Sequence, residues 1–372
     1  MGTHSLVVGY TSHYSPLGYR LLRRKRETER YNPYIERAVG RSYDGGSEGF
    51  LVKVAFLPEF GDPDVLTIAE APMPRVGPND VLIKVAAAGV NRADILQRRG
   101  LYPSPPDAPP WPGLEVAGEV KRVGKGVTGF VPGQRVCALV PGGGYAQYVS
   151  CAEALVLPTP EGLTDHEAAA LPEAVCTVWS NLRVGGVPAA RSILIHGGSG
   201  GVGTIAIQIA KAIGMHVIVT AGGAERAARC VDLGADSAID YRSTDFSAAV
   251  AKYGGVDMVL DCIGGEYLKR NIAALKDDGT LVIIGLQSGA TAELNLASLL
   301  SRRLTVAGTA LRSRPIEQRA AIVADVRSSV WPLVPSHVRP IIHAVFPLED
   351  VARAHELMEN RGAFGKVVLS VS

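Results

Sequence analysis

The sequence has few of the features that mark secreted, membrane-spanning or zinc-ribbon proteins. Cysteine occurs only five times in 372 residues, widely spread and without a Cys-x-x-Cys pair. An odd, scattered set of thiols predicts reduced cysteines rather than a disulfide framework, so we expect a cytoplasmic protein. No stretch approaches the roughly 20 apolar residues that cross a bilayer, and we therefore expect no membrane partner.

An excess of one charge is also absent. The formal net charge is only +2, and no basic stripe with interleaved aromatic residues is found. These features argue against nucleic acid as a partner but leave room for a small anionic ligand. Hydrophobic residues make up 47% of the chain and charged residues 20%, and the length predicts two folded domains.

Residues 1–50 differ in composition from the rest. They are rich in Arg, Glu and Tyr, lack the apolar core of a secretory signal, and end in a Gly/Ser-containing linker. We expect a flexible extension. The run Arg23–Arg26 leaves open a basic targeting or docking segment, although Glu27 and Glu29 follow it at once.

From residue 51 onward the hydrophobic pattern predicts a mixed α/β protein. Short strands such as "DVLIKVAAAGV" and "GLEVAGEVKRVG" come first, and a helix is predicted over residues 165–184, capped by Thr164 or Asp165. Strands and helices then alternate, which is typical of a doubly wound parallel sheet. The tail reads strand, helix, strand, and we expect it to fold back onto the β-rich part.

The clearest chemical motif is "SILIHGGSGGVGTIAIQIAKAIG". Gly197, Gly200 and Gly203 lie between a predicted strand and a predicted helix, where a missing side chain lets backbone approach a pyrophosphate at the positive helix end. A pure packing role for these glycines is the alternative. The surrounding βαβ pattern favours dinucleotide binding.

The next strand end indicates which dinucleotide is bound. Enzymes that prefer NAD place Asp or Glu there, whereas this chain has Thr220 followed by Ala and two glycines. Arg226 and Tyr241 are the candidates to bind a 2′-phosphate, which predicts NADPH. Glu225 would oppose the phosphate, and a solvated surface position is the alternative for Arg226.

These motifs carry a family resemblance. From about Lys53 to the C-terminus the chain resembles zinc-independent medium-chain dehydrogenases/reductases of the quinone oxidoreductase branch, through "AAGVNRAD", "GLEVAGEV", "PGGGYAQYV", "LPEA", "HGGSGGVG", "DCIGG", "LRSR" and "GKVVL". The resemblance implies a GroES-like catalytic domain over residues 51–170 and 309–372, and a Rossmann NADPH-binding domain over residues 171–308. It also implies a homodimer that pairs through the last strands of the parallel sheet.

The resemblance also implies a site without metal. At positions where zinc-dependent relatives have cysteine and histidine ligands, this chain has Asn91 and Leu114. Glu115 and Glu173 remain as oxygen donors, too few and too hard for the usual three-ligand zinc site. Cys137 and Cys176 are expected to be small buried side chains.

Without a Lewis acid, an easily reduced acceptor such as a quinone is expected. The resemblance places Asn91 and Tyr102 beside the nicotinamide, in a cleft between the domains, as hydrogen-bond donors to the acceptor. The alternatives are that Asn91 caps a helix starting at Arg92 and that Tyr102 packs against the Pro-rich loop. For Arg92 and Asp94 we expect local salt bridges.

Further cofactor contacts come from the resemblance alone. Phe364 replaces an Asn of relatives and Gly223 replaces a Ser, which weakens two expected contacts. Arg312 and Arg314 are candidates for substrate or cofactor contact or for structural ion pairs, and His196 is expected to be a hydrogen-bonded structural residue. The predicted cofactor-binding residues are Thr177, Gly197, Gly198, Ser199, Gly200, Gly201, Val202, Gly203, Arg226, Tyr241, Gly285, Leu286, Gly365 and Lys366.

The sequence thus predicts a metal-free NADPH-dependent quinone reductase. Two rivals stay open. One is a reductase of α,β-unsaturated ketones or enoyl thioesters, in which Tyr102 would donate the proton. The other is a non-catalytic NADPH-binding sensor or structural protein.

Overall fold

The computed structural model describes residues 51–106 and 108–371, so the expected flexible extension over residues 1–50 lies outside the described part. The described residues form two compact units. One contains residues 51–176 and 312–371, and the other contains Thr177–Leu311. No helix in the described ranges is long and apolar enough to cross a membrane.

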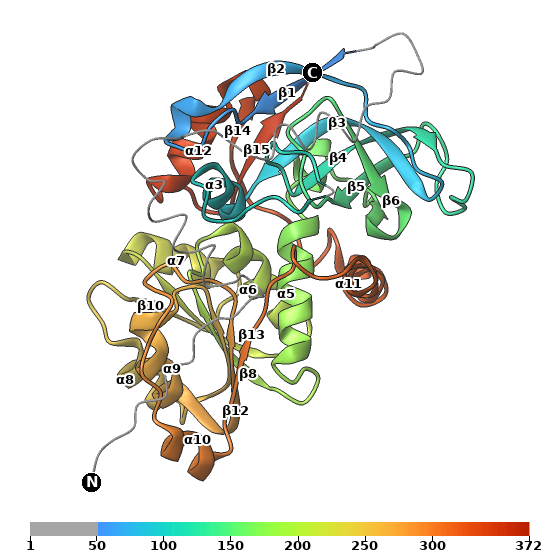
Figure 1. Cartoon of the computed structure of the whole chain (residues 1–372). Coiled ribbons are helices and arrows are strands. Elements are labelled where there is room, and N and C mark those ends of the chain that lie inside the picture. Colours follow the sequence, from blue (N-terminus) through green and yellow to red (C-terminus); the bar gives the residue numbers. More distant parts are fainter. Residues whose placement is uncertain (1–50, 107, 372) are drawn as a thin grey trace. The chain divides into compact units, whose positions relative to one another are not determined.

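The first unit is built on a mainly antiparallel sheet (Figure 1). Its order is β14-β15-β3-β4-β5-β7, with β6 paired to β3, while β1 and β2 form a separate antiparallel pair. The C-terminal tail folds back onto this sheet as expected, because β15 pairs with β3. The strands are β1 Leu51–Phe56, β2 Thr67–Pro72, β3 Asp80–Val90, β4 Glu115–Val123, β5 Arg135–Leu139, β6 Tyr148–Ala152, β7 Val156–Pro158, β14 Ile342–Pro347 and β15 Lys366–Ser370.

One predicted helix at the boundary of this unit is split in two, and its second part continues into the other unit at Thr177. The expected helix over residues 165–184 consists of α4 Asp165–Ala168, capped by the Thr164 side chain, and α5 Pro172–Val184. Pro172 has no backbone N–H and restricts the residue before it, so it begins a helix well but interrupts a continuous one. The break places Glu173 in the first turn of α5. The other helices of the unit are α3 Arg92–Arg98, α11 Ile316–Ser329 and α12 Val351–Glu359.

The second unit contains a six-stranded parallel sheet in the order β10-β9-β8-β11-β12-β13, with helices on both sides (Figure 1). This is the doubly wound order of a Rossmann fold, which reverses direction beside its first strand, β8. Because helices cover both faces, β8 is buried at every residue. The strands are β8 Ser192–His196, β9 His216–Ala221, β10 Ser237–Asp240, β11 Val256–Asp261, β12 Leu275–Ile283 and β13 Thr305–Gly308.

The helices of the Rossmann unit follow its strands. Leu194, Ile218, Val259 and Leu281 come from four neighbouring strands and form one apolar cluster with Phe246. The predicted combination of a GroES-like domain and a Rossmann domain is confirmed. The helices are α6 Gly201–Ala212, α7 Ala224–Asp232, α8 Phe246–Ala251, α9 Leu268–Ala274 and α10 Leu296–Arg302.

Candidate active site

Asn91 lies at the junction of β3 and α3, in the GroES-like unit. It is the residue before the first turn of α3, as the capping alternative predicts, and its backbone N–H donates to Asp94 Oδ2 at 2.8 Å. Its side chain points elsewhere. The amide Nδ2 donates to Glu115 Oε1 at 2.9 Å and, more weakly, to the Gly89 carbonyl at 3.4 Å.

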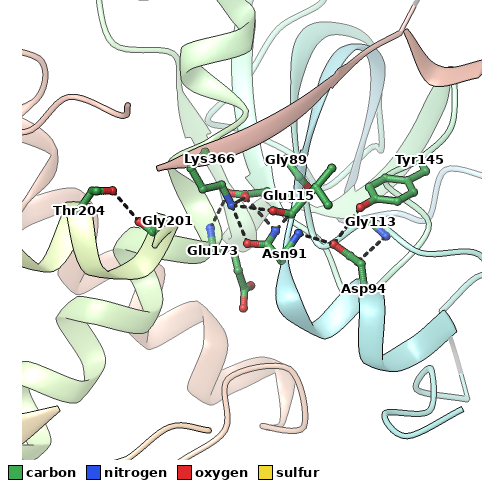
Figure 2. A network of polar contacts seen from close by, with 11 residues as sticks. Gly89, Asn91, Asp94, Gly113, Glu115, Tyr145, Glu173, Gly201, Thr204 and Lys366 are labelled. Carbon is green, nitrogen blue, oxygen red and sulfur yellow. Dashed lines mark hydrogen bonds and ion pairs between the residues drawn. The ribbon is translucent and has the colours of Figure 1, made fainter. Parts of the chain in front are cut away.

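A buried ion pair fixes the orientation of the Asn91 amide (Figure 2). Lys366 Nζ lies 2.5 Å from Glu115 Oε1 and donates to Asn91 Oδ1 at 2.6 Å and to the Val90 carbonyl at 3.4 Å. An ammonium is only a donor, so the Asn91 oxygen must face Lys366 and its NH₂ must face Glu115. We call Asn91, Glu115 and Lys366 the buried triad.

The buried triad uses nearly all of its polar capacity internally. The three contacts of Lys366 Nζ match the three N–H bonds of an ammonium. Glu115 Oε2 accepts the backbone N–H of Glu173 at 2.9 Å. Gly89 makes this arrangement possible, because a Cβ at that position would overlap Glu115 Oε1. The Lys366 side chain therefore has no N–H left in this structure for the cofactor contact that was predicted for it.

The donor set of this region does not fit a zinc ion. Glu115 already accepts hydrogen bonds on both oxygens, and Leu114 offers no donor atom. Within the described ranges, no group of three or more His, Cys, Asp or Glu side chains is placed to hold a metal. Cys137 and Cys176 are buried, as expected.

Asp94 differs from its predicted role. Instead of a local salt bridge, its fully buried carboxylate accepts hydrogen bonds from the backbone N–H of Asn91 and Gly113 and from the Tyr145 hydroxyl, at 2.8, 2.9 and 3.0 Å. Burial raises the pKa of Asp94 to about 6, while these hydrogen bonds oppose the rise. The prediction failed because Gly113 and Tyr145 are remote in sequence and reach Asp94 only through the fold.

Glu173 presents a second unusual carboxyl group. Its backbone N–H binds Glu115, but its side chain points away from the buried triad (Figure 2). Desolvation and, next, the negative charge of Glu115 raise the pKa of Glu173 to about 8. At neutral pH this carboxyl group is mainly protonated and is a hydrogen-bond donor.

Tyr102 lies beside a buried arginine. The Arg312 guanidinium carbon is 5.4 Å from the centre of the Tyr102 ring, within range of a cation–π contact. Arg312 Nε donates to the Pro141 carbonyl at 2.7 Å, and Nη2 donates to Ser104 Oγ at 3.1 Å. These two partners of Arg312 are neutral oxygens. Among the described residues, the structural ion pair that was one alternative for Arg312 is therefore not formed. Tyr102 is half-buried.

In the Rossmann unit the glycine loop connects β8 to α6. Gly197 has a positive φ of 71°, and a Cβ on Gly203 would overlap the Gly197 carbonyl oxygen. Gly200 precedes the first turn of α6, whose leading N–H groups have no partner within the helix. The loop and helix start therefore provide a backbone cradle that fits a pyrophosphate. The loop residues are Gly197, Gly198, Ser199, Gly200, Gly201, Val202 and Gly203.

The end of β9 brings together groups that suit a 2′-phosphate. The Tyr241 hydroxyl lies 2.8 Å from where a Cβ of Gly222 would stand, and Arg242 Nε lies 3.4 Å from the same point. Arg226 is half-buried in the first turn of α7, and Glu225 beside it is exposed. Sequence reasoning missed Arg242, although it directly follows Tyr241 in "IDYR".

The remaining predicted cofactor residues have varied surroundings. Thr177 is half-buried in α5, and Leu286 is exposed in the loop after β12. A Cβ on Gly285 would lie 2.8 Å from the Cys262 carbonyl oxygen, and Gly365 has a φ of 93°.

His196 is confirmed as a structural residue, because its ring binds Thr220 Oγ1 at 3.0 Å and Asn271 Oδ1 at 2.7 Å.

Comparisons with known proteins agree with this arrangement. Residues 77–161 match the alcohol dehydrogenase GroES-like domain, and residues 201–325 match the zinc-binding dehydrogenase family. The chain is 32% identical to quinone oxidoreductase of Homo sapiens and 34% identical to that of Sus scrofa. Each match covers 84% of this chain and 95% of the relative.

Solved structures give the same result. Quinone oxidoreductase of Pseudomonas syringae has 28% identity and a TM-score of 0.75, covering 87% of this chain and 100% of that one. A mycobacterial protein complexed with NADPH has 29% identity and a TM-score of 0.76, covering 86% and 99%. This chain is therefore an oxidoreductase that belongs to the quinone oxidoreductase branch of the medium-chain dehydrogenases/reductases.

Proposed function

We propose that this protein reduces quinones with NADPH and without a catalytic metal. One observation carries the proposal: Lys366, Glu115 and Asn91 form a closed buried triad in the region where zinc-dependent relatives have ligands. Activation of the acceptor then falls to organic hydrogen-bond donors, which are sufficient for an easily reduced substrate. The quinone oxidoreductases among its relatives support this acceptor class.

NADPH is the proposed cofactor, and when bound it supplies the hydride. The glycine loop and the start of α6 would hold the pyrophosphate. Arg226, Tyr241 and Arg242 would hold the 2′-phosphate at the end of β9. The nicotinamide end would contact Thr177, Gly285, Leu286 and the Gly365–Lys366 segment. The NADPH-bound mycobacterial structure supports this choice of cofactor.

Asn91 and Tyr102 are the proposed contacts for the acceptor. The 3.4 Å contact from Asn91 Nδ2 to the Gly89 carbonyl is long, so this N–H is the most weakly bonded donor of the triad and could share its hydrogen bond with an acceptor oxygen without a change in the amide orientation. Tyr102 contributes a ring for stacking and a hydroxyl. The two residues thus fit a flat acceptor that bears oxygen.

Reduction of an α,β-unsaturated ketone or an enoyl thioester is the second candidate. It is favoured by 33% identity to a segment of a phenolphthiocerol/phthiocerol polyketide synthase of Mycobacterium tuberculosis, although the match covers only 14% of that protein. In this reaction the hydride would go to a β-carbon, and Tyr102 would donate the proton.

The test is NADPH and NADH oxidation by the full-length chain with ortho- and para-quinones, an enone and a 2-enoyl thioester, in the presence of a chelator. We expect rapid quinone-dependent loss of NADPH that the chelator does not change and that Tyr102→Phe and Asn91→Ala reduce. Turnover of only the enone or thioester would favour the second candidate. NADPH binding without turnover would favour a non-catalytic binding protein.

We also propose a homodimer and a cytoplasmic location. Among the described strands, β13 pairs with β12 alone and forms an edge of the parallel sheet, and Leu300 in the preceding α10 is 83% exposed. An open edge with apolar neighbours suits pairing with a second copy. Light scattering during size-exclusion chromatography measures the dimer. None of the five cysteines, all of which lie in the described part of the chain, forms a disulfide, which suits a reducing compartment.

A further inference from the structure

Arg312 has one guanidinium nitrogen without a function in the fold. The side chain is only 6% exposed, and Nε and Nη2 are held by Pro141 and Ser104. Among the described residues, Nη1 has no hydrogen-bond partner even though it is fully buried. A buried charged donor left unpaired costs free energy, so such a group calls for an explanation.

A purely structural role, in which Arg312 clamps two loops together, explains only two of the three guanidinium nitrogens. The contacts of Nε and Nη2 tie the loop after Tyr102 to the loop after β5, and they occupy two of the three nitrogens. Nη1 does not contribute to the clamp. Burial lowers the pKa of Arg312, and the negative charge of Asp94 is the strongest of the influences that oppose this change.

The surroundings of Arg312 are those of the proposed acceptor site. The guanidinium lies over the ring of Tyr102, and the carboxylate of Asp94 is in the helix that Asn91 begins. Guanidinium groups stay charged in proteins and bind oxyanions strongly. In a buried position their stabilisation of a nearby negative charge is much greater than in water.

We propose that Arg312 Nη1 donates a hydrogen bond to the acceptor oxygen that gains negative charge during reduction. This inference rests on the proposed function. A quinone that accepts hydride from NADPH becomes a hydroquinone monoanion, leaving NADP⁺, and one proton from solvent then gives the hydroquinone. Arg312 supplies the positive charge that a metal ion supplies in zinc enzymes. Its hydrogen bond stabilises the acceptor oxygen while the hydroquinone monoanion forms.

The test measures oxyanion binding without turnover. The full-length chain is saturated with NADP⁺ and titrated with 4-nitrophenol, whose phenolate form is followed by absorbance while the pH is varied. We expect the wild-type protein to lower the pKa of the bound probe by about one unit relative to Arg312→Gln, a tenfold change in the phenolate-to-phenol ratio. Arg312→Lys, which keeps the charge but not the fork, should give an intermediate shift.

Two control variants separate charge from structure. Ser104→Ala removes a clamp contact but keeps the guanidinium, so it should retain the shift. Arg353→Gln makes the same charge change at an exposed helix position and should also retain it. Loss of the shift in Ser104→Ala to the same extent as in Arg312→Gln would indicate a structural role only and overturn the proposal.

Other outcomes are equally decisive. No saturable binding of 4-nitrophenol to the wild-type protein, or an equal probe pKa in wild type and Arg312→Gln, would overturn the proposal. A shift that depends on Arg312 in a protein that reduces no quinone would support the oxyanion site and refute the proposed acceptor class. Quinone reduction that is unchanged in Arg312→Gln would support the proposed acceptor class and refute the oxyanion site at Arg312.

Discussion

The glycine loop of the Rossmann unit and the buried triad of the GroES-like unit are specified in opposite ways. The loop residues are consecutive, and Gly197 to Gly203 can be identified directly from the sequence. The triad joins Asn91, Glu115 and Lys366, which are separated by up to 275 residues and meet only because β15 pairs with β3 and β3 with β4. A motif of consecutive residues predicts local backbone geometry. An ion pair between strands can be predicted only when the order of the strands in the sheet is known.

Breaking the triad should have the largest effect. Lys366→Met leaves the Glu115 carboxylate buried without its ion-pair partner, and we expect a loss of about 3–5 kcal/mol in the free energy of unfolding. Urea denaturation measures it. The double variant Glu115→Gln/Lys366→Met should lose less than the sum of the two single variants. Additive losses would show that the two charges do not interact.

The loop gives the next largest effect. Gly203→Ala places a Cβ against the Gly197 carbonyl and 2.7 Å from Gly198 Cα, which are backbone atoms that cannot move aside freely. We expect a loss of about 1–3 kcal/mol in unfolding free energy without cofactor. Gly200→Ala is the matched control, because its Cβ would meet only the Gly197 oxygen, at 3.4 Å. Equal stability of the two variants would contradict this packing.

The third prediction concerns the pH dependence of stability, which Glu173 should change because its pKa is raised by burial and by Glu115 of the triad. Its pKa rises from an ordinary 4.5 to about 8 on folding, so the folded state binds the extra proton and loses stability as the pH increases from 4.5 to 8. Glu173→Gln has no such loss. The full pKa shift corresponds to about 3–4 kcal/mol between pH 5 and pH 8. Because the Glu173 side chain is only half-buried, solvent screening should reduce this gain in stability relative to wild type to about 1–2 kcal/mol.

Thermal denaturation across this pH range measures the difference. Asp94 also titrates in this range, with a pKa of about 6, but it is present in both proteins and cancels. Glu161→Gln, at an exposed position, serves as the control and should parallel wild type at every pH. A constant difference between Glu173→Gln and wild type would refute the raised pKa.

The smallest effect concerns cofactor choice. Arg242→Gln and Arg226→Gln should each weaken NADPH binding by about tenfold and leave NADH binding unchanged, because only NADPH carries the 2′-phosphate. Fluorescence titration of the nicotinamide measures both affinities. Arg229→Gln, one turn farther along α7, should change neither. Equal weakening of both cofactors would place these arginines outside the phosphate site.

Sequence reasoning succeeded where neighbours in sequence are neighbours in space. Alternating strands and helices identified the Rossmann sheet, and the spacing of glycines identified the turn from β8 to α6. It failed for Asp94, whose expected salt bridge is a buried set of hydrogen bonds, and for the helix that Pro172 divides. It also missed Arg242, which lies beside Gly222 only because β10 pairs with β9.

The sequence by itself determined the fold class and the place of the glycine loop between a strand and a helix, because each depends on residue types within short segments. Tertiary structure alone decided that Lys366 neutralises Glu115, that burial beside Glu115 raises the pKa of Glu173, and that Arg312 Nη1 has no hydrogen-bond partner among the described residues. Desolvation and ion pairing depend on which distant groups share a buried volume, and that is set only when the strands have paired.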